Sequence, residues 1–207
     1  MFQYLKEDKI YYISFYSGLL LFFFSVFLTF IIPATPVHKN HSQLNSTIIA
    51  LELSNTIEQI RSIVGKPEDE KFFINHNKYI YSTYYDFLYI FTYSFFFLML
   101  FEIGSRKYSP GFILKRLFYF FLFLAFLFDI LENIKLLIIL KSLTNILTDE
   151  DVYTLRNISL TKWFGIFVLC GIIGLLFWLP KKNYLLKVAG LLLFVSFLLS
   201  LIGIFKL

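Results

Sequence analysis

Four polar residues interrupt an apolar run that is long enough to cross a lipid bilayer. The run covers residues 117–140, and near its middle it contains Asp129, Glu132, Asn133 and Lys135. An ionisable side chain at the centre of a spanning helix costs about 3 kcal/mol on insertion scales, so it faces a partner, a cavity or a pathway rather than lipid. We therefore expect the functional site to lie in this run, although the residue types alone do not name a ligand.

Helical geometry places three of these residues on one face. At about 100° per residue, Asp129, Glu132 and Asn133 fall within about 100° of one another. Lys135 is offset by about 60° from Glu132, and we expect the two side chains to pair at a spacing of three residues. Asp129 then requires a partner from another segment.

A second apolar segment, at residues 79–103, supplies further polar groups. One helix face there carries Ser82, Asp86, Tyr89 and Tyr93. If this helix runs inward and the helix at 115–140 runs outward, Asp86 lies about 7 Å outside the midpoint of its span, and Glu132 about 6 Å outside its own. We predict a ligand-binding polar pocket in the outer half of the membrane, lined by Asp86, Tyr89, Asp129, Glu132, Asn133 and Lys135.

The composition is that of an integral membrane protein. The chain has 207 residues, of which 58% are hydrophobic, and its mean hydropathy is +0.71, values that do not fit a soluble domain of this length. The net charge of +5 arises from lysines and arginines in short loops, so the expected partner is the lipid bilayer and not nucleic acid. Cys170 is the single cysteine, which excludes an intrachain disulfide or a Cys-x-x-Cys motif.

Hydropathy predicts an all-α membrane protein, with a bundle of about five transmembrane helices in a single domain over residues 1–207. Each span has roughly 18 to 25 residues, which matches about 30 Å of hydrocarbon at about 1.5 Å per residue. The spans are placed near residues 11–32, 79–103, 115–140, 162–180 and 184–205.

The basic residues of the short loops define an orientation. They fall on one side of the membrane if the N-terminus is cytoplasmic, because short cytoplasmic loops retain lysine and arginine. These residues are Lys6, Lys9, Arg106, Lys107, Lys115, Arg116, Lys181, Lys182 and Lys187. We expect a multi-pass protein of the cell membrane with a cytoplasmic N-terminus and an extracytoplasmic C-terminus.

The segment at residues 33–78 is then extracytoplasmic, and it contains a predicted amphipathic helix near 47–64. Apolar residues recur with helical spacing at Ile49, Leu53, Ile57, Ile60 and Val64. Gly65 is expected to end this helix. The helix either packs against the ends of the spans, lies flat on the membrane surface or folds over the bundle as a lid.

Several other residues have side chains that could take part in chemistry. Lys162 begins the fourth span and is interpreted as an interfacial residue that extends its ammonium toward water, with contact to an outer carboxylate as the alternative. A serine nucleophile at Ser196 or Ser200 lacks a histidine within the spans. Ligation of a metal by the loop histidines is an open but disfavoured alternative, so no metal site is predicted, and neither a catalytic residue nor a cofactor is identified.

The Asp-x-x-Glu-Asn spacing of Asp129, Glu132 and Asn133 resembles a motif in uncharacterised bacterial polytopic membrane proteins, which also carry an aspartate early in the preceding span. No activity is attached to those proteins, so the resemblance adds no mechanism. Motifs of intramembrane enzymes, such as Gly-x-Ser-Gly and Glu-Glu-x3-Arg, do not occur in this sequence.

Three functions stay open on the sequence alone. The favoured one is a small transporter whose pocket binds a cation, a proton or the polar end of a lipid-like ligand. The alternative is a structural or assembly subunit of a membrane complex, held by a membrane-protein partner or by a second copy of the chain. The second alternative is a lipid-modifying membrane enzyme that uses Asp129 or Glu132 as a general base.

Overall fold

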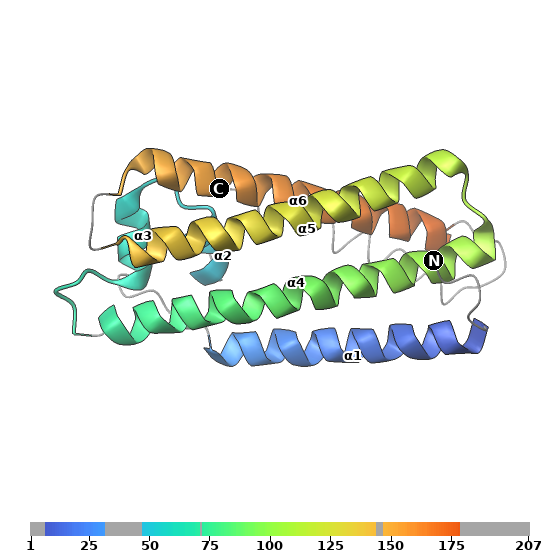
Figure 1. Ribbon diagram of the computed structural model, residues 1–207, viewed down its shortest axis with the longest axis horizontal. Helices are drawn as coiled ribbons and strands as arrows, with labels where there is room; N and C mark the ends of the chain where they lie inside the picture. Colours follow the sequence, from blue (N-terminus) through green and yellow to red (C-terminus); the bar gives the residue numbers. More distant parts are fainter. Residues whose placement is uncertain (1–6, 32–46, 71, 144–146, 179–207) are drawn as a thin grey trace. The chain divides into compact units, whose positions relative to one another are not determined.

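Every regular element in the residues that the structure describes is a helix (Figure 1). The computed structural model describes residues 7–31, 47–70, 72–143 and 147–178. Its helices are α1 (Glu7–Ile31), α2 (Thr47–Glu52), α3 (Ile57–Val64), α4 (Phe72–Tyr108), α5 (Phe112–Lys141) and α6 (Asp149–Trp178). The predicted all-α class is confirmed for this part of the chain, and the predicted span at 184–205 lies outside the described residues.

Three of the described helices are long and apolar enough to cross a membrane, namely α1 (over Lys9–Leu28), α4 and α6. They correspond to the predicted spans at 11–32, 79–103 and 162–180, and they are compatible with a multi-pass membrane protein. Helix α5 covers the predicted span at 115–140 and has 30 residues, like α6. Its role as a span, the total of five spans and the orientation of the termini stay predictions.

The long helices begin earlier than their apolar segments. Helix α4 has 37 residues, which gives a length of about 55 Å against about 30 Å of hydrocarbon. It ends at Tyr108, after which Ser109 has φ 42° and Pro110 cannot continue the helix. Helix α6 starts at Asp149, because the carboxylates of its first turn favour a helix N-terminus and Thr148 caps it.

The described chain forms two compact units, and α1, α4, α5 and α6 each contribute to both. The first unit contains residues 7–21, 92–126 and 163–178, and the second unit contains 22–31, 47–70, 72–91, 127–143 and 147–162 of the described residues. In the first unit, Phe101 of α4 stacks on Phe118 of α5 with a centroid distance of 3.8 Å. In the same unit, Gly165 lets α6 approach the backbone of α5 at Ala125.

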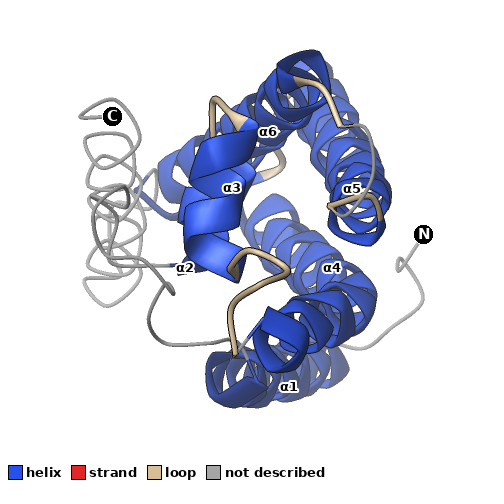
Figure 2. Ribbon diagram, turned by 90° about the vertical axis from the view of Figure 1, so that its left-hand side faces the viewer, coloured by secondary structure: helices blue, strands red, loops and turns tan. Residues whose placement is uncertain are grey.

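The core of the second unit includes the predicted amphipathic segment. Leu51, Ile60 and Val64 are fully buried there, together with Tyr79 of α4 and Leu155 of α6. Figure 2 shows the short helices α2 and α3 beside the longer helices that contribute to this unit. The segment therefore packs in one core with residues of α4, α5 and α6, and its placement relative to a membrane stays a prediction.

The single helix predicted near 47–64 is in fact two helices. The break falls between Glu52 and Ile57, where Ser54 donates its hydroxyl proton to the Ala50 carbonyl and Thr56 caps α3 by accepting from the Gln59 amide. Serine, asparagine and threonine favour such local bonds over a continuing helix. Gly65 ends α3 with φ 107°, as the sequence predicts.

Substitution of Gly165 tests the close approach in the first unit. A Cβ atom at this position lies 3.2 Å from Ala125 Cβ and 3.3 Å from its Cα and N atoms, so Gly165→Ala should destabilise the protein by about 1–3 kcal/mol through overpacking. Thermal unfolding of the detergent-solubilised chain measures the effect. Gly171→Ala is the control, because nothing lies within 4 Å of its added Cβ. An equal response of both variants contradicts the prediction.

Candidate functional site

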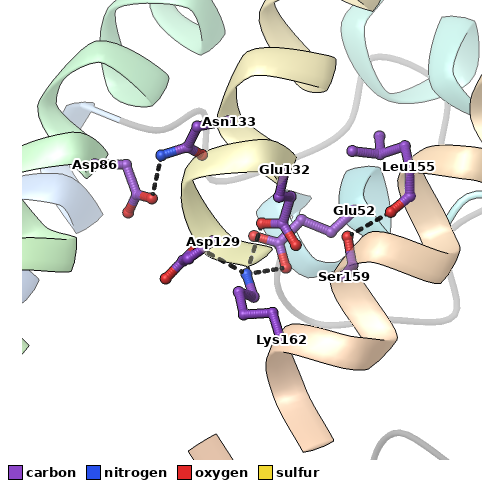
Figure 3. Close-up of polar contacts among 8 residues, drawn as sticks. All are labelled: Glu52, Asp86, Asp129, Glu132, Asn133, Leu155, Ser159 and Lys162. Atoms are coloured by element: carbon purple, nitrogen blue, oxygen red, sulfur yellow. Dashed lines mark hydrogen bonds and ion pairs between the residues drawn. The ribbon is translucent and has the colours of Figure 1, made fainter. Parts of the chain in front are cut away.

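Lys162 of α6 lies at the centre of a buried group of carboxylates in the second unit (Figure 3). Its Nζ atom is 2.6 Å from Glu132 Oε1, 3.3 Å from Glu52 Oε2 and 3.4 Å from Asp129 Oδ1. The Lys162 side chain is 5% exposed and that of Glu132 is 1% exposed. We call Glu52, Asp129, Glu132 and Lys162 the Lys162 cluster.

Three helices bring the members of the Lys162 cluster together. Asp129 and Glu132 are three residues apart on α5, and both face Lys162, in agreement with the shared face expected from their spacing. Glu52 is the last residue of α2, next to the buried Leu51 that anchors this short helix in the core. Ser159 lies one turn before Lys162 on α6, and its hydroxyl donates to the Leu155 carbonyl at 3.0 Å.

A second polar contact adjoins the cluster and adds α4 to the site. The amide of Asn133 donates to Asp86 Oδ2 at 2.8 Å, so α4 and α5 are joined directly beside Glu132. Asn133 was expected to line the same pocket as Asp86, and the structure brings the two side chains into contact. Asp86 is thus held by an uncharged donor, whereas Lys162 contacts the carboxylates of α2 and α5.

Two of the predicted site residues lie differently. The expected pair between Lys135 and Glu132 is wrong, because Lys135 Nζ bonds to Asp151 Oδ1 at 2.7 Å while Glu132 binds Lys162. Lys135 is turned away from the cluster, and the early start of α6 places the carboxylate of Asp151 within its reach. Tyr89 accepts a hydrogen bond from Ser25 of α1 at 3.5 Å, so its hydroxyl faces α1.

Glu52 was not predicted as a site residue, and the predicted place of Lys162 was wrong. Glu52 is a single acidic residue within the apolar stretch 48–53, and that isolation was the signal that it is buried. Lys162 was assigned to the membrane interface, but its side chain is buried and contacts three carboxylates. The structure contains the contact with carboxylates that was the alternative, whereas their position in a membrane stays a prediction.

The Lys162 cluster combines an excess of acidic groups with little exposure. Three carboxyl groups surround one ammonium, and Asp86 adds a fourth carboxyl group beside them. Glu132 Oε2 is buried and accepts no hydrogen bond from any described residue. Burial of several carboxyl groups beside one ammonium is costly.

Comparisons with protein-family models, with curated proteins and with solved structures found no match. The chemistry of the Lys162 cluster therefore carries the functional interpretation. The likeness of Asp129, Glu132 and Asn133 to a motif of bacterial membrane proteins stays a prediction.

Replacement of Lys162 tests how strongly the cluster depends on its ammonium. Lys162→Met leaves three buried carboxyl groups without their cation and should lower the free energy of unfolding by about 3–5 kcal/mol. Thermal or steric-trap unfolding in detergent measures the loss. Lys135→Met is the matched control, because it breaks a partly exposed pair with Asp151 and should cost at most about 1 kcal/mol. Similar losses for the two variants contradict the prediction.

Proposed function

We propose that the chain is a multi-pass membrane protein that binds a small cation at the Lys162 cluster and exchanges it as part of transport. The main support for the proposal is the number of carboxyl groups at one buried ammonium. Glu52, Asp129 and Glu132 all contact Lys162. One lysine neutralises one carboxylate. A bound cation, either a metal ion or a proton, reduces the remaining negative charge.

The energetic cost of burial supports a ligand. A buried ion pair repays its desolvation only when the charges are matched and the remaining lone pairs are satisfied. In the Lys162 cluster the charges are unmatched, and Glu132 Oε2 has no donor among the described residues. A network that only fastened helices would need one carboxylate for its lysine, so the additional acidic groups indicate a second role.

The distribution of the cluster over several helices supports exchange. Glu52 belongs to α2, Asp129 and Glu132 belong to α5, and Lys162 belongs to α6. Binding of a cation changes the attraction between these elements and therefore favours one arrangement of them over another. In the predicted topology α2 is extracytoplasmic, which gives the cluster a route toward the outer side through Glu52.

Asp129→Asn tests the proposal with a nearly isosteric change. Vesicles that contain the purified protein are loaded with a cation-sensitive dye, and gradients of protons, sodium or potassium are imposed in turn. The wild-type protein should dissipate one of them, and Asp129→Asn should slow this at least about tenfold, as expected for a lost interaction of about 1.4 kcal/mol. Its thermal transition is measured in parallel to establish that the variant is folded.

Asp151→Asn serves as the control, because Asp151 is a carboxylate outside the cluster that pairs with Lys135. It should transport at the wild-type rate. A folded Asp129→Asn protein with unchanged rates for every gradient, or a wild-type protein that dissipates none of them, refutes the proposal.

A structural role is the second candidate, and one observation favours it. Lys162 contacts carboxylates on α2 and α5 at once, so the cluster connects three helices. Apolar residues of similar volume often replace such a network without loss of stability. If the combined variant Glu52→Leu, Asp129→Leu, Glu132→Met and Lys162→Met folds and transports normally, the role is structural.

A further inference from the structure

We infer that the cation bound by this site is a proton, and that the carboxyl pair of Glu52 and Glu132 carries it. The inference rests on the proposed function, because it names the ligand of the same cluster. Uptake converts one carboxylate of the pair into a carboxylic acid. Hydronium supplies the proton, so one O–H bond forms at the carboxyl oxygen, one O–H bond of hydronium breaks and water leaves, and the cluster gains one positive charge.

The position of Lys162 argues against a metal ion. Its Nζ atom lies within 3.4 Å of an oxygen from each of the three carboxyl groups, which is the central place that a metal ion would occupy. Hard cations bind several oxygen ligands at about 2.0–2.6 Å, and the ammonium at that centre repels them. Among the described residues, no group of three or more histidine, cysteine or acidic side chains has the geometry to hold a metal ion.

The hydrogen bonding of Glu132 argues for a proton. Its Oε1 atom accepts from Lys162 at 2.6 Å, whereas the buried Oε2 atom receives no hydrogen bond from the described residues. A carboxylic acid has a neutral O–H group where a carboxylate has a charged oxygen, so a proton removes the cost of this buried charge. A proton also needs no coordination shell and therefore no additional space.

Glu52 is the natural second member of the pair. Its Oε2 atom lies 3.3 Å from the same nitrogen that Glu132 contacts, so the two carboxyl groups face one ammonium from different helices. Two neighbouring carboxyl groups in a buried site do not both stay ionised without a large repulsion, which one proton relieves. The Glu52 side chain is 10% exposed and that of Glu132 is 1% exposed, so the proton enters through Glu52.

Two further acidic side chains of the described residues lie near the pair. Asp129 faces Lys162 from α5, one turn from Glu132, and adds negative charge that favours proton uptake. Asp86 of α4 accepts the Asn133 amide, which satisfies one of its oxygens without a charge. Lys162 donates to both members of the pair, and its positive charge together with the proton offsets two of the three negative charges of the cluster.

Infrared difference spectroscopy tests the inference on the full-length protein in lipid nanodiscs. Acidification should produce a carboxylic acid stretching band that moves on exchange into heavy water. Glu132→Gln should abolish this band, Glu52→Gln should weaken or displace it, and the control Asp151→Asn should leave it unchanged. Sodium, potassium, magnesium and calcium ions, each added alone, should not remove it.

Isotope labelling of the wild-type protein also assigns the band to glutamate or aspartate. It requires no substituted protein and therefore does not depend on whether a variant folds. Glutamate labelled at its side-chain carboxyl carbon should displace the band, whereas equally labelled aspartate should not. A band that responds only to labelled aspartate, a band removed by one of the metal ions, or the absence of any such band overturns the inference. If the vesicles still dissipate a cation gradient, the proposed function survives this failure; if they do not, both fail.

Discussion

The contact between the Lys162 ammonium and its carboxylates organises the second unit. A lysine and three acidic side chains have lost most of their contact with water there, and their mutual attraction offsets part of the cost of that burial. Each partner fixes one element, because Lys162 lies on α6, Glu132 and Asp129 lie on α5, and Glu52 lies on α2. The same contacts therefore form the site and join these helices.

The apolar exterior of the helices explains why polar contacts matter so much here. Phe15, Phe22 and Phe23 of α1 are more than half exposed, and so is Phe123 of α5. Between helices surrounded by lipid the hydrophobic effect supplies little attraction, so close packing at small residues and polar contacts determine which faces meet. Gly165 against Ala125 in the first unit is an example of close packing at small residues. Asn133 with Asp86 in the second unit is an example of a polar contact.

The sequence allowed the helical class and part of the site to be predicted, because these depend on local spacing. Asp129 and Glu132 share a face at a spacing of three residues, and Gly65 ends a helix, as expected. The partner of Lys135 was not predictable from α5 alone, since Asp151 became available only because α6 begins well before its apolar segment. Glu52 was not predicted for a similar reason. Its burial depends on tertiary contacts, which the spacing of residues along its own helix does not predict.

The shortness of α2 has a consequence for how the site is assembled. A helix of six residues is not stable in isolation, so α2 exists because Leu51 and its neighbours are packed in the core. Helices α5 and α6 have 30 residues each, and they carry Asp129, Glu132 and Lys162. The long helices thus hold an incomplete set of charges, and the six-residue helix α2 completes it with Glu52.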